Sequence, residues 1–290
     1  MQENETNIFD QVAISAALQT SHMIQVFRVT MIEVLTKTHI EQDNASRPLV
    51  YRPDGSLEST YEVSTVYLRA GYSPDEYSSQ SVWEARYQLE LSAAIKCPSI
   101  LTHLAGSKKI QQILASPDTS WLEHYLSSTP YATYIIRVRD TFAAMYPLDD
   151  SPSGQNGINL AKDPQQCVKY VLKPQREGGG NNIYGTKIPP HLASLGNDEA
   201  KYRSHILMEL IEPPSVHNTI LRNGQMQSGE VIGELGIFGV ILWRAADKVS
   251  PEEILENHEA GFLLRTKGRE SEEGGVAAGF GAIDSPCLVD

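Results

Sequence analysis

Three consecutive glycines, at positions 178–180, follow a lysine, an arginine and a glutamate in the stretch LKPQREGGGNNIYG. A glycine costs roughly 0.5–1 kcal/mol relative to alanine in regular structure, so three in a row need a reason. A backbone without Cβ atoms can approach a ligand closely and point N–H groups at it. Lys173 and Arg176 suit phosphate oxygens, and Glu177 suits Mg²⁺. The stretch therefore predicts a nucleotide–Mg²⁺ site, with an exposed glycine-rich turn between two strands as the alternative.

Charged residues recur among apolar segments of the C-terminal region. Arg265 and Lys267 stand two apart in LLRTKG, which places both on one face of a strand. Glu234 interrupts the apolar strand GELGIFG, where an unpaired carboxylate would be costly and where Mg²⁺, a lysine or a ribose hydroxyl would relieve that cost. Glu273 precedes a second glycine pair. Each is compatible with a solvated strand end or a structural ion pair, but their joint occurrence favours a binding site.

The elements that must position these residues form two regions. Over residues 1–105, strands alternate with helices, which is typical of a parallel, Rossmann-like sheet in an α/β domain. Two turn-rich segments, one of them centred on RPDGS, separate the elements. The expected helices are FDQVAISAALQ, MIEVLTK and QSVWEARYQLELSAAI, and the expected strands are MIQVFRV and YEVSTVYLR, the latter ending at Arg69.

The second region, residues 106–290, starts with a mostly helical segment that reaches about residue 165. Within it, SPSGQNG is expected to be a flexible connection. Apolar strands separated by short turns follow, and they predict an antiparallel sheet. These strands are QCVKYVLK, SHILMELI, GEVIGELGIFGVILWR and AGFLLRTK.

Composition restricts the classes of partner. The chain has 290 residues and a formal net charge of −12, which disfavours nucleic acid and anionic membrane as general partners but not small anionic ligands. No apolar run approaches the ~18 residues of a transmembrane helix, and the polar start MQENETNIFDQ is unlike a signal peptide. Three widely spaced cysteines, Cys97, Cys167 and Cys287, indicate free thiols in a reducing compartment, with the cytosol as the expected location.

Several motifs together resemble those of eukaryotic glutathione synthetase, an ATP-grasp ligase. They are LKPQREGGGNNIYG, ILMELI, GELGIFG, LLRTK and EGGVAAG, preceded in the same order by ETNIFDQ, YLRAGY, WEARYQLELSAAIKCPSI and LAGSKKIQQIL. The resemblance covers most of the chain and is weak only around 116–165 and 186–204. It implies a Rossmann-like substrate domain over 1–105 and, over 106–290, an ATP-grasp region with an antiparallel sheet and a glycine-rich lid.

The reaction implied by the resemblance joins γ-glutamylcysteine and glycine into glutathione. ATP phosphorylates a carboxylate of γ-glutamylcysteine, and the amine of glycine then attacks the acyl phosphate. Two unit charges 4 Å apart repel by about 4 kcal/mol at an effective dielectric of 20, so cations and Mg²⁺ must offset that repulsion. A closed lid would also exclude water from the acyl phosphate. The resemblance further implies a homodimer.

Site residues follow from the resemblance by matched position. Lys173, Lys267 and Arg265 are the expected catalytic groups, and the fork of Arg265 suits a substrate carboxylate. Glu177 is the expected Mg²⁺ ligand. The positions matched to ATP contacts are Lys108, Lys173, Gly178, Gly179, Gly180, Asn181, Asn182, Tyr184, Met208, Glu209, Leu210, Ile211, Glu234, Lys267 and Glu273. Those matched to substrate contacts are Glu5, Thr6, Asn7, Gln11, Arg69, Ala70, Gly71, Tyr72, Arg265, Val276 and Ala277.

The sequence departs from the family pattern in two respects. Thr6 and Ala70 are side variations, and Ala70 stands where an aspartate is common. The family chain also continues upstream of ETNIFDQ with further Mg²⁺ ligands, and only MQEN precedes that motif here. Two alternatives to the active ligase stay open: an inactive module that binds nucleotide or γ-glutamylcysteine beside a full-length chain, and a structural scaffold. We also expect exposed apolar surface on both regions.

Overall fold

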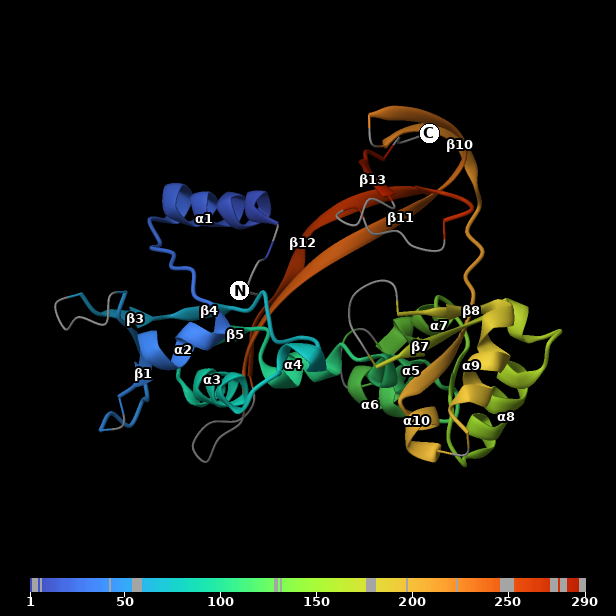
Figure 1. Cartoon of the computed structure of the whole chain (residues 1–290), viewed down its shortest axis with the longest axis horizontal. Coiled ribbons are helices and arrows are strands. Elements are labelled where there is room, and N and C mark those ends of the chain that lie inside the picture. Colours follow the sequence, from blue (N-terminus) through green and yellow to red (C-terminus); the bar gives the residue numbers. More distant parts are fainter. Residues whose placement is uncertain are drawn as a thin grey trace.

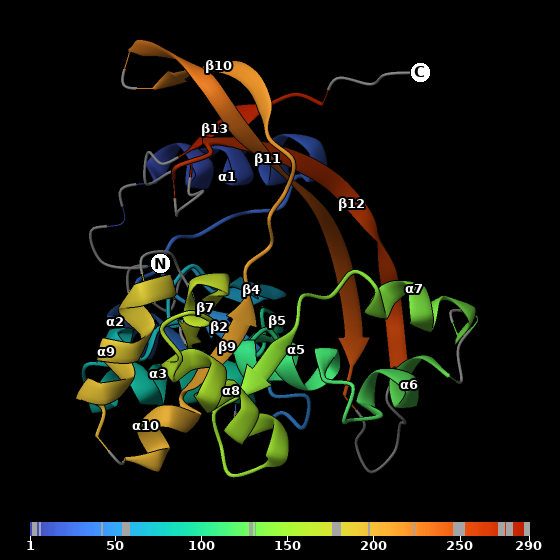
Figure 2. The ribbon, with the colours of Figure 1, turned by 90° about the vertical axis from the view of Figure 1, so that its right-hand side faces the viewer.

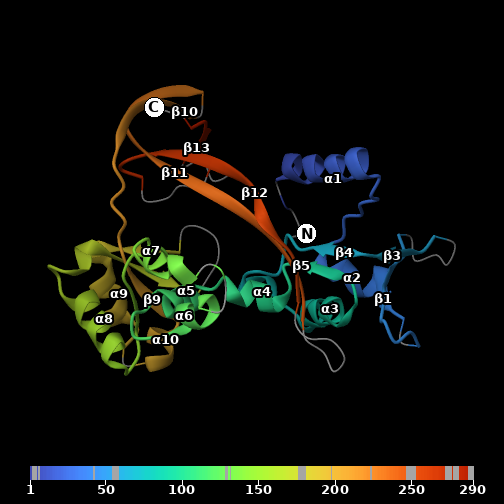
Figure 3. The ribbon, with the colours of Figure 1, turned by 180° about the vertical axis from the view of Figure 1, so that it is seen from behind.

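The computed structural model describes residues 1, 5, 7–41, 43–53, 59–127, 130, 132–175, 181–196, 198–222, 224–245, 253–271, 276 and 281–286. Two lobes lie apart, and a long sheet arches above them (Figure 1). Seen from behind, helix α4 lies between the two lobes (Figure 3). The architecture is mixed α/β with one parallel and several antiparallel strand pairings.

The first lobe packs helices against two small sheets. Strands β1, β2 and β3 form an antiparallel sheet, and β4 pairs in parallel with β5 through the crossover helix α3. A buried apolar cluster, which includes Val34, Leu49, Ala85 and Leu89, holds the lobe together. The elements are α1 (Ile8–His22), α2 (Met31–Lys37), β1 (Thr38–Ile40), β2 (Leu49–Tyr51), β3 (Tyr61–Val63), β4 (Thr65–Tyr67), η1 (Pro74–Glu76), α3 (Gln80–Leu91), β5 (Ile95–Cys97) and α4 (Ile100–Ala105).

The three helices that the sequence predicted in this lobe are present as α1, α2 and α3, but the predicted third helix runs past Leu91 to Ile95, which belongs to β5, and the strands were predicted only in part. The segment MIQVFRV is not a strand, because Phe27 packs its ring against Tyr51 and Tyr61 at centroid distances of 4.6 and 4.7 Å instead of joining a sheet. YEVSTVYLR is interrupted at Ser64, so β3 and β4 belong to different sheets. The parallel arrangement expected for the whole region is found in the β4–β5 pair.

The second lobe is a four-stranded antiparallel sheet with helices around it. Its strand order is β6-β9-β7-β8, and its core includes Leu148, Leu172, Ile188, Leu192 and Leu207. The elements are α5 (Lys108–Ala115), α6 (Trp121–Leu126), η2 (Ala132–Tyr134), α7 (Ile135–Arg139), β6 (Met145–Pro147), α8 (Pro152–Lys162), η3 (Cys167–Lys169), β7 (Tyr170–Pro174), β8 (Ile183–Tyr184), η4 (Gly185–Lys187), α9 (Ile188–Ser194), α10 (Glu199–Arg203) and β9 (His205–Glu209).

The segment SPSGQNG is the first part of helix α8, so the flexible connection expected there is wrong. Ser151 is the N-cap and accepts a hydrogen bond from the N–H of Gly154, and Pro152 occupies the first turn, where its missing donor is harmless. Both glycines, Gly154 and Gly157, are buried. These residues resemble a loop in composition, yet they serve as a helix start and as close-packing positions.

The third body is an antiparallel sheet in the order β10-β11-β12-β13. The antiparallel pairing predicted for the C-terminal strands is confirmed, but the strands divide between two sheets, with β7 and β9 in the second lobe and β11 and β12 here. Its strands are β10 (Val216–Arg222), β11 (Gln225–Arg244), β12 (Glu253–Gly268) and β13 (Gly281–Asp284). The β11–β12 hairpin runs from the top of the arch down to the level of the helices of the lobes (Figures 1 and 2). Many of its apolar side chains are exposed, as the sequence predicted. Within the described ranges, no helix combines the length and apolar character that crossing a bilayer requires.

We expect Gly157→Ala to destabilise the second lobe, although alanine is the better helix former. An alanine Cβ at this position would lie 2.7 Å from Tyr146 Cβ and 2.9 Å from the Pro147 carbonyl oxygen. Overpacking of this kind costs typically about 1–3 kcal/mol. Urea unfolding measures the loss, and Asn156→Ala, at an exposed position of the same helix, is the control that should stay within about 0.5 kcal/mol of the parent. Equal stability of the two variants would contradict the packing argument.

Candidate functional site

Three of the predicted site residues meet on the β11–β12 ribbon. Glu234 lies opposite Arg265 in the strand register, and Lys267 lies two residues further along β12. The Glu234 carboxylate accepts a hydrogen bond from Arg265 Nη2 at 3.0 Å, and its other oxygen lies 3.1 Å from Lys267 Nζ. This confirms that Arg265 and Lys267 share one face. Two cations around one carboxylate leave a surplus positive charge, which suits an anionic ligand in an otherwise acidic chain.

Burial makes the lysine the most constrained member of this cluster. The side chain of Lys267 is 15% exposed, whereas those of Glu234 and Arg265 are 34% and 45% exposed. An ammonium group that is mostly buried beside a carboxylate has lost part of its hydration. Its interaction with a further anion would therefore be stronger than that of a surface lysine. The carboxylate that the sequence identified as costly is thus paired with both cations.

A second group of predicted residues meets between helix α1 and strand β4. Arg69 Nε and Nη2 both contact Glu5 Oε1, at 2.8 and 2.5 Å, and Arg69 Nη1 contacts Asp10 Oδ2 at 2.5 Å. The hydrogen bond to Glu5 is the largest of the contacts that raise the pKa of the Arg69 guanidinium above its ordinary value. Among the described residues, Glu5 Oε2 is buried and has no hydrogen-bond partner. The described residues therefore leave one acceptor oxygen of this group without a donor.

The chain around Arg69 is fixed in a tight turn. Gly71 has a φ of +78°, and its carbonyl oxygen accepts a hydrogen bond from Tyr77 Oη at 2.7 Å. A Cβ on Gly71 would lie 2.8 Å from that hydroxyl, so a side chain is excluded on two grounds. Glu76 accepts the N–H of Gly71 at 2.9 Å, while Ala70 is buried and Tyr72 is exposed. The turn therefore presents Arg69 and Tyr72 in defined positions.

The other predicted residues at helix α1 differ in their exposure to solvent. Gln11 is buried, and its Oε1 accepts a hydrogen bond from Arg28 Nη1 at 3.5 Å. Asn7 is exposed at the N-cap position of the helix and makes no side-chain cap. Gln11 belongs to the same helix as Asp10, so the ion pair with Arg69 helps to hold the helix that carries both.

A third group lies where helix α5 begins and strand β7 ends. Lys108 is the first residue of α5, and the backbone N–H of Lys109 donates to Gln175 Oε1 at 2.9 Å. Gln175 is two residues beyond Lys173, so this bond brings the start of α5, with its two lysines, to the end of β7. Cationic side chains beside a helix N-terminus form a favourable setting for a phosphate.

The segment matched to the adenine contact continues from the same sheet. Met208 lies opposite Val171 in the strand register, as does Tyr184 on the other side, so all three belong to neighbouring strands. The N–H of Leu210 donates to the Lys169 carbonyl at 2.8 Å, the N–H of Glu209 to the Ala144 carbonyl at 2.9 Å, and Ile211 is exposed. Asn181 is exposed, and Asn182 Nδ2 donates to Tyr184 Oη at 3.2 Å.

The predicted residues therefore fall on three different sheets. Val276 lines a pocket of about 480 Å³ on the third body, between Asn218–Leu221 of β10 and the residues of β13. The remaining predicted residues lie outside the described residues: Thr6, Glu177, Gly178, Gly179, Gly180, Glu273 and Ala277. In the part of the chain that the structure describes, no group of three histidine, cysteine, aspartate or glutamate side chains is arranged to hold a metal ion.

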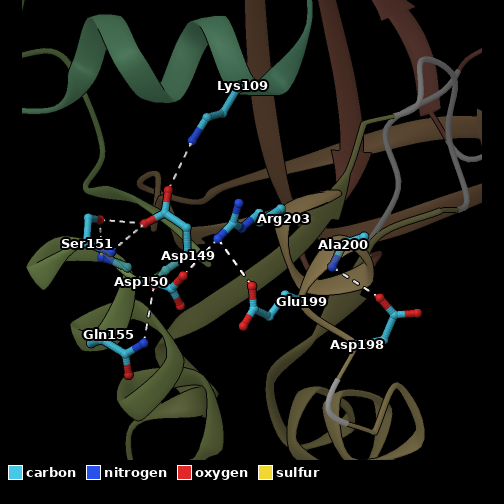
Figure 4. A network of polar contacts seen from close by, with 10 residues as sticks. Lys109, Asp149, Asp150, Ser151, Gln155, Asp198, Glu199, Ala200 and Arg203 are labelled. Atoms are coloured by element: carbon cyan, nitrogen blue, oxygen red, sulfur yellow. Dashed lines mark hydrogen bonds and ion pairs between the residues drawn. The ribbon is translucent and has the colours of Figure 1, made fainter.

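Sequence reasoning missed two participants in these contacts, Asp10 and Lys109. Lys109 Nζ lies 3.8 Å from Asp149 Oδ2, and a chain of contacts continues from Asp149 to Ser151 (Figure 4). Burial raises the pKa of Asp149, but the hydrogen bonds from Ser151 and the charge of Lys109 outweigh it, so the net pKa lies below its ordinary value. Asp10 had one available signal, its place inside the ETNIFDQ motif; Lys109 stood beside the lysine that was chosen.

A nearby pocket of about 270 Å³ is lined by charges that already pair with each other. Arg203 bridges Asp150 at 2.8 Å and Glu199 at 3.3 Å (Figure 4). All three side chains are more than half exposed, so the pairs contribute little free energy and are screened by salt. We interpret this network as a surface feature of the second lobe.

Comparisons with known proteins agree on one family. The model for the eukaryotic glutathione synthase ATP-binding domain matches residues 4–288. The chain is 41% identical, over 97% of its length, to the glutathione synthetase large chain of Schizosaccharomyces pombe. It is 41% identical over 100% of its length to the chloroplastic glutathione synthetase of Solanum lycopersicum and 43% identical over 99% to the Homo sapiens enzyme.

The match covers only part of each relative. The chain spans 52%, 48% and 56% of the fission yeast, tomato and human proteins, which is about half their length. Among solved structures, a glutathione synthetase-like effector of Globodera pallida in its apo form superposes with a TM-score of 0.65 at 18% identity. That superposition covers 99% of this chain and 55% of the other, and it shows a common fold.

We expect Arg69→Met to be far more destabilising than Asp10→Asn. Removing Arg69 leaves the Glu5 carboxylate, whose side chain is only 10% exposed, without its cation, a loss of about 3 kcal/mol. Asp10 is 47% exposed, so its ion pair should contribute less than about 1 kcal/mol. Chemical denaturation of both variants at neutral pH compares the two losses. If Asp10→Asn were the more costly change, the buried pair would not be the anchor of this turn.

Proposed function

Because the chain belongs to the eukaryotic glutathione synthase family, we propose that it contributes the ATP-binding region of a glutathione synthetase and part of its peptide-substrate site. The observation that carries the proposal is the Glu234–Arg265–Lys267 cluster, which gathers three charges of two matched motifs on one face of a ribbon. The reaction of this class joins γ-glutamylcysteine and glycine into glutathione with ATP as the phosphoryl donor.

On the nucleotide side, we assign the phosphates to lysines. Lys108 and Lys173 would hold them from the second lobe, and Lys267 from the ribbon, with Glu234 accepting from a ribose hydroxyl. The tie between Lys109 and Gln175 supports this assignment, because it holds the α5 lysines near the end of β7. The backbone groups of Met208, Glu209, Leu210 and Ile211 that are not used within the sheet would bind the adenine, and Asn181, Asn182, Tyr184 and Glu273 are the further proposed nucleotide contacts. The glycines Gly178, Gly179 and Gly180 would form a lid over the phosphates.

On the peptide side, we assign recognition of γ-glutamylcysteine to the Arg69 turn and helix α1. Glu5 Oε2 is the buried acceptor there, and an ammonium group of the substrate would satisfy it. Asn7, Gln11, Tyr72 and the backbone of 69–72 would line the same site. Arg265 would hold the carboxylate that is activated, and Val276 with Ala277 would lie beside the glycine acceptor.

The chemistry that these side chains perform is charge compensation and positioning. A carboxylate must approach a polyphosphate, and each lysine or arginine placed between them lowers the repulsion. Mg²⁺ commonly serves the same purpose, with Glu177 as the proposed ligand. Among the described residues, no group of three histidine, cysteine, aspartate or glutamate side chains could hold the ion.

We further propose a division into a substrate domain, 1–105, and an ATP-grasp region, 106–290, that acts as a homodimer. Two separate apolar cores support the division, one built from residues up to Ala94 and the other from residues after Met145. The free thiols of Cys97 and Cys167 support the cytoplasmic location that the cysteine pattern predicts.

We expect Lys267→Met to weaken ATP binding roughly tenfold, because a charge-assisted hydrogen bond contributes about 1.5–3 kcal/mol. Isothermal titration with ATP in excess Mg²⁺ measures the dissociation constant. Lys201→Met is the matched control, since that lysine is 60% exposed on α10, away from all three clusters. An unchanged constant for Lys267→Met, or an equal loss in the control, would contradict the assignment of this lysine.

Arg265→Met should separate the two ligands. We expect it to reduce binding of γ-glutamylcysteine at least tenfold and to leave ATP binding within about threefold, because Arg265 is assigned to a carboxylate and Lys267 to a phosphate. Titrating each ligand into the same protein provides the comparison. A larger effect on ATP than on the peptide would reverse the two assignments, and failure of the parent chain to bind either ligand would refute the proposed function.

A further inference from the structure

Two side chains that follow the Arg69 turn in the chain hold its backbone at Gly71. Glu76 Oε2 accepts the N–H of Gly71 at 2.9 Å, and Tyr77 Oη donates to the Gly71 carbonyl oxygen at 2.7 Å. Glu76 Oε1 also accepts the N–H of Ser73 at 3.2 Å. Gly71 belongs to neither a helix nor a strand. These side-chain bonds therefore take the place of the main-chain ladder that fixes a residue in regular structure.

Helix α3 holds the Tyr77 side chain in place. The Tyr77 ring packs against Trp83 at a centroid distance of 4.1 Å with a tilt of 30°. Its hydroxyl lies beside the Arg86 guanidinium, since a Cβ built on Gly71 would be 2.8 Å from Tyr77 Oη and 3.7 Å from Arg86 Nη1. Burial raises the pKa of the Tyr77 hydroxyl, and the charge of Arg86 offsets only part of this rise. The hydroxyl therefore keeps its proton, and donates, well above neutral pH.

The support beneath this hydroxyl is a buried ion pair. Arg86 is only 4% exposed, and its Nε and Nη2 lie 2.9 and 2.8 Å from Glu90 Oε1, one helical turn further along α3. The same oxygen accepts the N–H of Ile100, the first residue of α4, at 2.9 Å (Figure 3). Because breaking a buried pair is costly, Arg86 is a rigid neighbour for the Tyr77 hydroxyl.

The two sides of Gly71 are held by different interactions. Ala70 is 4% exposed and belongs to the buried apolar cluster of the first lobe, so packing helps to fix the side of the turn that carries Arg69. Tyr72 is 43% exposed, and it follows the carbonyl group that Tyr77 holds. Loss of the Tyr77 hydroxyl would therefore loosen the turn where packing contributes least.

We propose that Tyr77 is a positioning residue for the peptide ligand, because its hydroxyl fixes the turn that presents Arg69 and Tyr72. Tyr77 would act through the turn without touching the ligand, since its one hydroxyl hydrogen is already donated to Gly71. A displaced turn would also move the Arg69 guanidinium relative to the carboxylate of Glu5, to which it is bonded. This inference rests on the proposed function, which assigns the Arg69 turn to recognition of γ-glutamylcysteine.

Tyr77→Phe tests the proposal, because it removes the donor and keeps the ring that packs against Trp83. We expect the dissociation constant for γ-glutamylcysteine to rise about fivefold, as for the loss of one hydrogen bond. The constant for ATP should stay within about twofold, since the phosphate lysines lie on other elements. Isothermal titration measures both constants. Tyr87→Phe is the matched control, because it removes a hydroxyl from a tyrosine of the same helix that is 65% exposed.

Hydrogen exchange of the ligand-free protein reads the turn directly. In Tyr77→Phe we expect the backbone amides of Gly71 and Ser73 to exchange about fivefold faster, while those of α3 keep their rates. Tyr87→Phe should leave both sets unchanged. A purely structural role of Tyr77 would instead speed exchange across the first lobe and weaken both ligands alike.

Each outcome decides between these explanations. Unchanged exchange at Gly71 and Ser73 would overturn the proposal, as would faster exchange there with unaltered affinity for γ-glutamylcysteine. Weaker binding of the peptide together with faster exchange confined to the turn would support it. If the parent chain bound no γ-glutamylcysteine, the proposed function would fail, and the exchange rates alone would support or refute control of the turn by Tyr77.

Discussion

The contact on which the candidate nucleotide site depends is the sharing of one carboxylate, Glu234, between Arg265 and Lys267. It exists because β11 and β12 pair antiparallel in one particular register. This register sets Glu234 opposite Arg265, with Lys267 two residues further along β12 on the same face. A shift of one residue would turn both cations to the other face of the ribbon. Register is therefore the property that keeps a surplus positive charge at this point, and the ladder of main-chain pairing on either side of Glu234 is what fixes it.

The Arg69 turn has the reverse arrangement of charges, with two carboxylates around one cation. There, one guanidinium contacts two carboxylates, Glu5 and Asp10, and Glu5 Oε2 is buried without a hydrogen-bond partner among the described residues. The acidic character of the whole chain does not decide what it binds; the local balance at each cluster does, because salt screens exposed charges beyond about 8 Å.

The sequence predicted those parts of the fold in which periodicity and burial agree. Helix α2 was identified to the residue, because its apolar positions face the core and Thr30 and Glu33 cap its first turn. The antiparallel pairing of β11 and β12 followed from apolar strands separated by short turns, and the shared face of Arg265 and Lys267 followed from their two-residue spacing. Prediction failed where packing overrides composition: α8 uses glycines to approach β6, and Phe27 packs with tilted rings against Tyr51 and Tyr61 outside any sheet. Asp10 was missed because its partner is 59 residues away, a distance that no local pattern encodes.

The charged cluster lies at the boundary of the four-stranded part of the third body. Glu234 lies just beyond Val231, the last residue that β10 pairs, and just before the charge-free stretch that begins at Leu235. Arg265 and Lys267, in contrast, lie where β13 covers β12. One side of the cluster is therefore held by a complete sheet, while on the other side β11 pairs only with β12 among the described residues.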